Sequence, residues 1–122
     1  MANWYDKQFP KLAQDDRPGC WLRWLAETDE EEALLYRHKE AMKQKAKTMR
    51  ATMLLHFQHE KGTVDEKKAM VETNDEVYYS DKEYFDAEQS WRTLHNQRDT
   101  VNTAYEAWRT MRADQRATAK GM

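Results

Sequence analysis

The feature that most constrains this chain is a regular apolar pattern between Val77 and Trp108. Positions three and four residues apart in this stretch are Val77, Ser80, Tyr84, Ala87, Trp91, Leu94, Arg98, Val101, Tyr105 and Trp108. Eight of these ten residues are apolar, and the stretch holds no Gly or Pro. An α-helix places residues with this spacing on one face. The pattern therefore predicts a long helix with a continuous apolar seam, which needs a long surface to cover it.

A second apolar row precedes the first and offers that surface. Its members are Leu35, Met42, Ala46, Met49, Met53 and Phe57. The row is followed by Gly62, the residue type that most easily adopts the left-handed conformation that ends helices. We therefore expect a second long helix that ends near Lys61 and packs against the seam.

Three Thr residues predict where the helices begin. Thr28, Thr63 and Thr73 each stand three residues before a Glu, which is the capping-box spacing. We therefore expect a first long helix from Thr28, a short helix over Val64–Glu72 and a last helix from about Asn74 to Ala119. Residues 21–26 are either a separate helical turn or an early start of the first helix.

The composition agrees with an all-α fold. Among 122 residues there are only 3 Gly and 2 Pro, with 34% charged residues, and such a chain favours long helices over a sheet. We predict an antiparallel helical hairpin of two long helices joined by a short helix (29–122), with an irregular N-terminal arm (1–28). The last helix is the longer one, so its end should extend past its partner. The core is thin, and we expect either further copies of the chain or a partner to complete it.

The arm carries three aromatic residues, Trp4, Tyr5 and Phe9. They pack either on the helices of their own chain or on a neighbouring subunit, and the sequence leaves both readings open.

No pattern in the sequence indicates an enzyme, a cofactor or a metal site. The three glycines, Gly19, Gly62 and Gly121, lie too far apart in the sequence for either of the glycine-rich phosphate-binding loop motifs. The four histidines (His38, His56, His59 and His95) lack a spacing typical of metal ligands. The single Cys20 excludes an intrachain disulfide and suits a reducing compartment. With no membrane span and no secretory signal expected, we predict a cytoplasmic protein, or a host-cytoplasmic one if it is phage-encoded.

Two basic stretches are the most informative polar feature, although the formal net charge is −2. The first stretch includes Lys43, Lys47 and Arg50. The second has Arg109, Arg112, Arg116 and Lys120 at steps of three, four and four residues, and so on one helix face. In an antiparallel pair we expect the middle of the first long helix to lie opposite the middle or distal half of the last. The two stretches should then form one surface that binds phosphates. The alternative is that these side chains only solvate helix faces and complement the helix dipole.

Arg98 is the one charge inside the apolar seam. It either extends its guanidinium to solvent, pairs with an acidic residue of the facing helix, or fixes the register as a buried polar group does in coiled coils. A structural role is favoured over a phosphate contact.

Three segments resemble small helical phage proteins of recombination, more distantly the UvsY-like family of recombination mediators. They are 47–62 (KTMRATMLLHFQHEKG), 63–80 (TVDEKKAMVETNDEVYYS) and 84–116, above all YEAWRTMRADQR at 105–116. The shared order is a basic helix, a glycine turn, a short helix and a long aromatic-bearing helix with a basic end. This sequence departs from the family in its apolar stretch 51–57 and its acidic block 72–88.

The resemblance implies a helical, ring-forming homo-oligomer without enzymatic activity. Such proteins bind single-stranded DNA and help a RecA-like recombinase displace a single-strand-binding protein. The family's DNA contacts near the end of the first long helix correspond here to Lys43, Lys47 and Arg50. We therefore expect a recombination mediator whose DNA-binding residues are these three together with Arg109, Arg112 and Arg116. The alternative is a helical protein-interaction module, either an adaptor or a phage inhibitor of a host protein, that does not contact nucleic acid.

Overall fold

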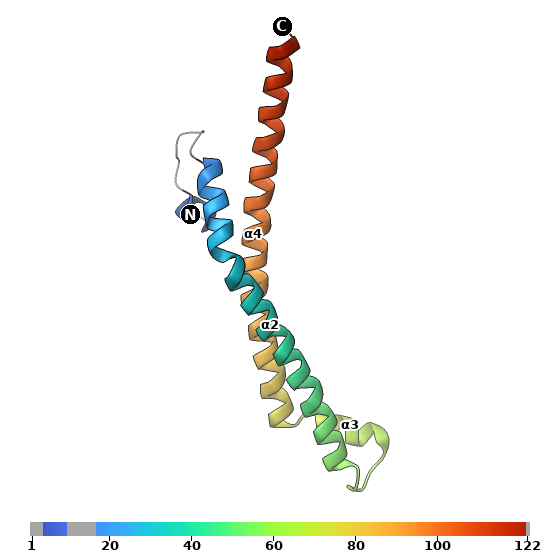
Figure 1. Cartoon of the computed structure of the whole chain (residues 1–122). Helices are drawn as coiled ribbons and strands as arrows, with labels where there is room; N and C mark the ends of the chain where they lie inside the picture. The colour runs from blue at the N-terminus through green and yellow to red at the C-terminus, as the bar shows by residue number, and fades with distance from the viewer. Residues whose placement is uncertain (1–3, 10–16, 122) are drawn as a thin grey trace. The chain divides into compact units, whose positions relative to one another are not determined.

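The computed structural model describes residues 4–9 and 17–121, and its elements are four helices (Figure 1). They are α1 (Trp4–Gln8), α2 (Arg17–Phe57), α3 (Val64–Glu72) and α4 (Asp75–Gly121). Two long helices pack against each other, and a short one lies between them in sequence, so the predicted all-α hairpin is confirmed. The chain divides into two compact units. Unit 1 comprises the described residues up to Glu32 and those from Thr93 onward, and unit 2 comprises Ala33–Arg92.

The predicted seams are confirmed. All ten seam positions of α4 are buried or half-buried, with Val77 exposed to 1% and Val101 to 0%. The apolar row of α2 is likewise buried or half-buried, with Ala46 at its centre exposed to 4%. The large aromatic side chains of the seam are half-buried, because they fill the rim of a two-helix contact and not an enclosed core.

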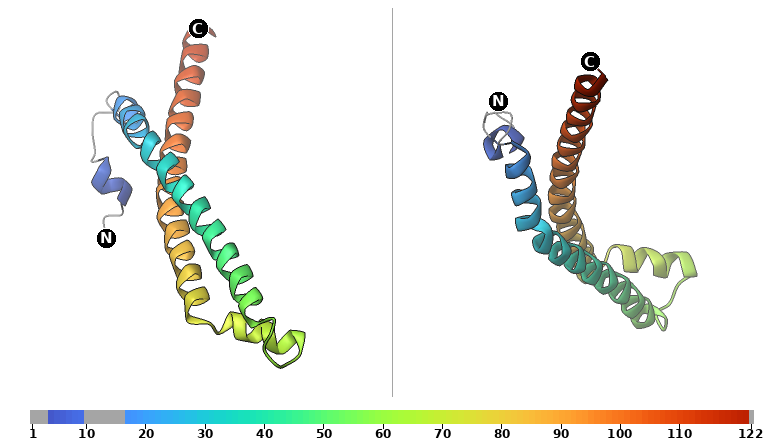
Figure 2. Two further views of the ribbon diagram at one scale, coloured as in Figure 1. Left: turned by 60° about the horizontal axis from the view of Figure 1, so that its bottom comes forward. Right: turned by 45° about the horizontal axis from the view of Figure 1, so that its top comes forward.

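Unit 2 contains the hairpin turn. The Lys45 Nζ lies 2.9 Å from a carboxylate oxygen of Glu83, and the Arg50 guanidinium lies 2.6 Å from Asp81. The later residue of α2 thus contacts the earlier residue of α4, so the two helices are antiparallel. The short α3 lies between the end of α2 and the beginning of α4 (Figure 2). Its Lys67 Nζ donates to the Gln58 carbonyl at 2.8 Å and so satisfies one group at the end of α2.

The turn into α3 follows the prediction closely. Gly62 has φ +136°, and a Cβ there would lie 2.6 Å from a Glu66 carboxylate oxygen. Thr63 caps α3, and its hydroxyl accepts from the Glu66 amide at 3.2 Å. The long helix ends at Phe57, a few residues before the expected Lys61.

The start of α4 is where we expected it, but the capping residue is a different one. The Asn74 side chain accepts from the amides of Glu76 and Val77 at 2.9 and 3.2 Å. The Thr73 hydroxyl instead donates back to the Ala69 carbonyl at 2.9 Å. The predicted Thr73 cap is wrong because Thr73 ends α3, and the residue after it is the better helix cap.

The predicted helix start at Thr28 is also wrong. α2 begins at Arg17, and the Thr28 hydroxyl donates to the carbonyl of Trp24 at 2.9 Å within that helix. Pro18 lies in the first turn, where its missing amide proton costs nothing. No breaker follows Gly19 within α2, so the helix crosses residue 28 without interruption. The boundary between an arm (1–28) and a hairpin (29–122) stays a prediction.

The N-terminal aromatics pack within their own chain. Trp4 and Phe9 lie 5.1 and 5.9 Å from the Trp24 ring, centroid to centroid. Phe9 is buried and Trp24 is exposed to only 8%. Part of the expected irregular arm is therefore helical, as α1, and residues 1–3 and 10–16 of that arm lie outside the described residues.

The end of α4 extends past the beginning of α2 in unit 1, as predicted (Figures 1 and 2). Arg17 and Trp21 of α2 line a hollow of about 250 Å³ with Trp108 and Met111 of α4. Beyond this point every residue up to Gly121 is exposed. We call residues Arg109–Gly121 the α4 extension. Among the described helices, none has an apolar stretch long enough to cross a bilayer.

Candidate nucleic-acid interface

Of the predicted DNA-binding residues on α2, Arg50 is bound to carboxylates. Its guanidinium contacts Glu72 at 3.1 Å and both oxygens of Asp81 at 2.7 and 2.6 Å. The hydrogen bond from Arg50 lowers the pKa of the Glu72 carboxyl, and the bonds to Glu72 and Asp81 raise the pKa of Arg50. Paired with two carboxylates, Arg50 offers little charge to a phosphate.

The neighbouring cations of α2 differ in burial and in their contacts. Lys45 is paired with Glu83. The ammonium of Lys39 lies 4.4 Å from the ring centroid of Tyr36 and 4.2 Å from that of Trp91. Lys43 is half-buried, Lys47 is exposed, and neither forms an ion pair with any described residue.

The expectation that the middle of the first helix faces the middle or distal half of the last is wrong. Lys45 and Arg50 meet Glu83 and Asp81, which belong to the acidic first half of α4. The reason is the early start of α2 at Arg17. Its additional turns occupy the partner surface along the distal half of α4.

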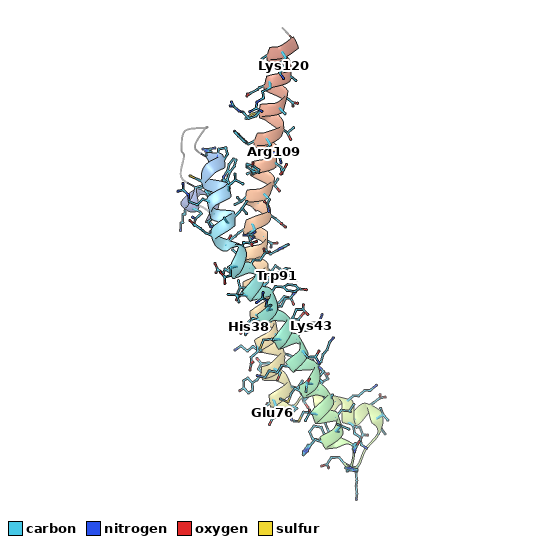
Figure 3. All side chains as sticks on the ribbon, viewed as in Figure 1. His38, Lys43, Glu76, Trp91, Arg109 and Lys120 are labelled. Atoms are coloured by element: carbon cyan, nitrogen blue, oxygen red, sulfur yellow. The ribbon has the colours of Figure 1, made fainter. Side chains whose placement is uncertain are left out.

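The second basic stretch has different surroundings. Arg109, Arg112, Arg116 and Lys120 all lie on the exposed α4 extension and share one helix face. Figure 3 labels Arg109 and Lys120 near the two ends of this extension. From Arg109 to Gly121 the sequence contains four basic residues and one acidic residue, Asp114. The one ion pair in this set joins Arg109 to Glu106 at 3.4 Å, among the described residues.

Two aromatic rings adjoin this basic face. Tyr105 and Trp108 are stacked, with centroids 6.1 Å apart and planes 26° from parallel. The Arg109 guanidinium lies 5.9 Å from the Tyr105 centroid, and that of Arg112 lies 5.9 Å from the Trp108 centroid. Both rings are half-buried. Half-exposed rings beside guanidinium groups provide stacking surfaces and cations, the two components with which proteins bind single-stranded nucleic acids.

We expected Tyr105 and Trp108 only as residues of the seam and missed that their rings also adjoin the basic face. The signal was present in the spacing, since Tyr105 and Arg109, like Trp108 and Arg112, are four residues apart and so adjacent on a helix. A ring at the edge of a seam can pack on one side and remain open on the other.

Arg98 is a structural residue of unit 1. Its guanidinium donates to the Leu25 carbonyl and the Thr28 hydroxyl, both at 2.7 Å. It also pairs with Glu32 at 2.8 Å and Asp29 at 3.2 Å. The acidic run after Thr28 therefore partners a cation of the facing helix and does not cap a helix start.

The histidines do not form a metal centre. No group of three or more metal-ligating side chains occurs in the described part of the chain. The His95 Nδ1 lies 2.8 Å from a Glu32 oxygen, which places it at the edge of the Arg98 network.

No family model, no curated protein and no solved structure matches the chain.

Proposed function

We propose that this protein is a non-enzymatic, phage-type accessory protein that self-assembles and binds single-stranded DNA as a recombination mediator for a RecA-like recombinase in the host cytoplasm. The observation that carries the DNA contact is the exposed basic face of the α4 extension beside the stacked Tyr105 and Trp108. The recombinase and the displaced single-strand-binding protein enter the proposal through the sequence resemblance alone.

The α4 extension is the main DNA contact in this proposal. Arg109, Arg112 and Arg116 neutralise successive phosphates, while the half-buried Trp108 ring offers the exposed part of its face for a base to stack on. Lys43 and Lys47 are available to phosphates because they form no ion pair among the described residues. They add weaker contacts in this proposal. Arg50 is assigned to the fold because Glu72 and Asp81 already bind it. One subunit offers few cations, so repetition in an oligomer supplies the affinity.

The test is a fluorescence anisotropy titration of a labelled single-stranded oligonucleotide at several salt concentrations. We expect Arg112→Glu combined with Arg116→Glu to weaken binding more than tenfold. We also expect the slope of log affinity against log salt to become shallower by about 1.4, since each phosphate contact on a single strand contributes about 0.7.

Lys68→Glu is the matched control, because it reverses one exposed charge on α3. It should change affinity less than twofold. Absence of binding by the wild-type protein at low salt, or equal losses in the control and in the double variant, would rule out the α4 extension as the DNA contact.

A second function, a helical protein-interaction module without nucleic-acid contact, is favoured by a specific property of unit 2. Between Ala33 and Arg92 the sequence has eleven basic and eleven acidic residues. The same unit exposes large aromatic side chains at Tyr78, Tyr79 and Phe85. A neutral surface with exposed aromatics is typical of protein interfaces. The titration separates the two functions, because an adaptor leaves the oligonucleotide unbound at every salt concentration.

A further inference from the structure

The hollow of unit 1 between the first turns of α2 and the facing turns of α4 is lined mainly by apolar side chains, with one cation. Its described lining is Arg17, Trp21, Ala104, Ala107, Trp108 and Met111, and its volume is about 250 Å³. Clefts that hold drug-sized molecules have at least about 300 Å³. The hollow therefore suits a single planar ring system and not a larger ligand.

The polar side-chain groups of this lining are hydrogen-bond donors. Arg17 is half-buried and forms no ion pair with any described residue. The indole nitrogen of Trp21 is buried and has no hydrogen-bond partner in the described part of the chain, and Trp21 as a whole is exposed to only 6%. A buried donor without an acceptor is uncommon in folded proteins. The described lining also contains no carboxylate, so its polar groups favour a ligand that carries acceptors and negative charge.

The hollow adjoins the basic face of the α4 extension. Trp108 lines the hollow, and the Arg112 guanidinium lies 5.9 Å from the centroid of its ring. Arg17 brings a further cation to the hollow from the other helix. A strand whose phosphates follow the arginines of the α4 extension therefore passes beside a hollow that is apolar, aromatic and rich in donors.

We propose that this hollow binds one unstacked nucleobase of single-stranded DNA, stacked against Trp108, and that Arg17 binds the phosphate next to that base. This inference rests on the proposed function and assigns the base contact a pocket. A nucleobase matches the lining because it combines a planar face with carbonyl or ring-nitrogen acceptors, which it brings next to the Trp21 ring. An apolar side chain of a protein partner would leave Arg17 and the Trp21 donor without acceptors. Since every base has a planar face, the pocket accepts different bases.

The test compares two labelled strands of equal length in fluorescence anisotropy titrations at one salt concentration. One strand is oligothymidylate, and the other has the same backbone with abasic sites in place of the thymidines. The phosphate contacts are the same for both strands, and stacking of a base on an aromatic ring adds to them only in the first. We expect the wild-type protein to bind oligothymidylate about tenfold more tightly than the abasic strand.

Ala107→Phe places a ring in the hollow and leaves every cation in place, and the position tolerates it because Ala107 is exposed. It should weaken binding of oligothymidylate about tenfold and leave binding of the abasic strand within twofold, so that the preference for bases disappears. Ala104→Leu fills the hollow from a half-buried position and should have the same effect. Ala113→Phe is the matched control, because Ala113 is exposed on the α4 extension outside the described lining of the hollow. It should keep the preference of the wild type.

Arg17→Gln tests the phosphate contact separately. It should make the slope of log affinity against log salt shallower by about 0.7, the contribution of one phosphate contact on a single strand. An unchanged slope would remove Arg17 from the site. Circular dichroism should show the helix content of the wild type in each of these variants.

The outcomes separate this pocket from the proposed DNA binding. Arg112→Glu/Arg116→Glu should weaken binding of both strands by the same factor and keep the preference for bases. Equal affinity of the wild type for the two strands would overturn the pocket alone, as would a preference that neither Ala107→Phe nor Ala104→Leu lowers, or that Ala113→Phe lowers as much. A wild-type protein that binds neither strand at low salt would overturn both proposals.

Discussion

Two stretches of this chain look alike in sequence and differ in the folded protein. Lys43, Lys47 and Arg50 form a basic run on α2, and Arg109, Arg112 and Arg116 form one on α4. In unit 2 the α2 stretch includes cations that are paired with carboxylates: Lys45 binds one and Arg50 binds two. In unit 1 the cations of the α4 extension are exposed, and Arg112 adjoins an aromatic ring.

The difference shows that a charged run stays available to a ligand only where no carboxylate of the fold pairs with it. Arginines that hold helices together and arginines that remain exposed are indistinguishable by residue type. The two kinds can be told apart once the facing helix is known. Mutations should also distinguish them, because one kind should change the free energy of unfolding and the other the affinity for DNA.

The largest effect on stability should come from Arg98, a cation bound within unit 1. Replacing it with Met removes the cation that binds the Leu25 carbonyl, the Thr28 hydroxyl and the Glu32 carboxylate. Because the Arg98 side chain is 13% exposed while Asp29 is 79% exposed, we expect a loss of about 2–3 kcal/mol in the free energy of unfolding, below the cost of breaking a fully buried pair. Urea unfolding followed by circular dichroism measures it.

Arg92→Met is the control for Arg98→Met. Arg92 pairs with Glu88 on the same helix and is largely exposed, so its replacement should cost less than about 0.5 kcal/mol. Equal losses in the two variants would show that the Arg98 network adds nothing beyond an ordinary surface pair.

Arg50 should have an intermediate effect that divides stability from DNA binding. Arg50→Gln removes the double contact with Asp81 and the bond to Glu72, and we expect a loss of about 1–2 kcal/mol, reduced by solvent because the side chain is 39% exposed. Affinity for single-stranded DNA should stay within twofold of the wild type. Parallel urea and anisotropy titrations measure both quantities.

Lys47→Gln sharpens that comparison, since Lys47 is exposed on the same helix. Its replacement should leave stability within about 0.5 kcal/mol and weaken DNA binding slightly. If Arg50→Gln weakens DNA binding more than Lys47→Gln does, then the guanidinium exchanges its carboxylates for phosphate, and the contrast between the two basic stretches fails.

Much of the fold could be predicted because it depends on local rules. The spacing of the seam fixed which face of α4 is covered, and Gly62 with Thr63 fixed the turn, since a left-handed residue and a side-chain cap act within a few residues. The start of α2 could not be found in this way. Thr28 and the acidic residues after it fit the capping pattern, but they lie inside a helix. There the guanidinium of Arg98, seventy residues later in the chain, binds the Thr28 hydroxyl.

The residues of the candidate site could be predicted from the sequence, but the contacts that the fold makes around them could not. The basic residues of the α4 extension were visible as a helical series. Their distinction from Arg50 depends on the register between α2 and α4, and this register follows from the helix start that the sequence pattern misplaced. The role of Tyr105 and Trp108 was hidden for a related reason, because a seam position reveals that a ring is covered on one side and not that its other side is open.

The smallest effect concerns pH, and it tests the same ion pair from the carboxylate side. Arg50 holds the pKa of Glu72 below its usual value of 4.5, mainly through the hydrogen bond between them. A carboxyl with a lowered pKa in the folded state stabilises the fold above its unfolded-state pKa, and this contribution is lost as the pH falls through the folded-state pKa. Wild type should therefore exceed Glu72→Gln in stability at neutral pH, and the difference should shrink as the pH falls below about 4.5.

Urea unfolding of both proteins at a series of pH values between neutral and acidic measures that difference. Asp114→Asn on the α4 extension is the matched control for removing an exposed carboxylate, because Asp114 forms no ion pair among the described residues. Since Glu72 is exposed, solvent screens the pair and the effect should be smaller than that of Arg50→Gln. A difference that grows on acidification would mean that the Glu72 carboxyl is disfavoured in its charged form, and Arg50 would then have to be counted among the cations free to bind phosphate.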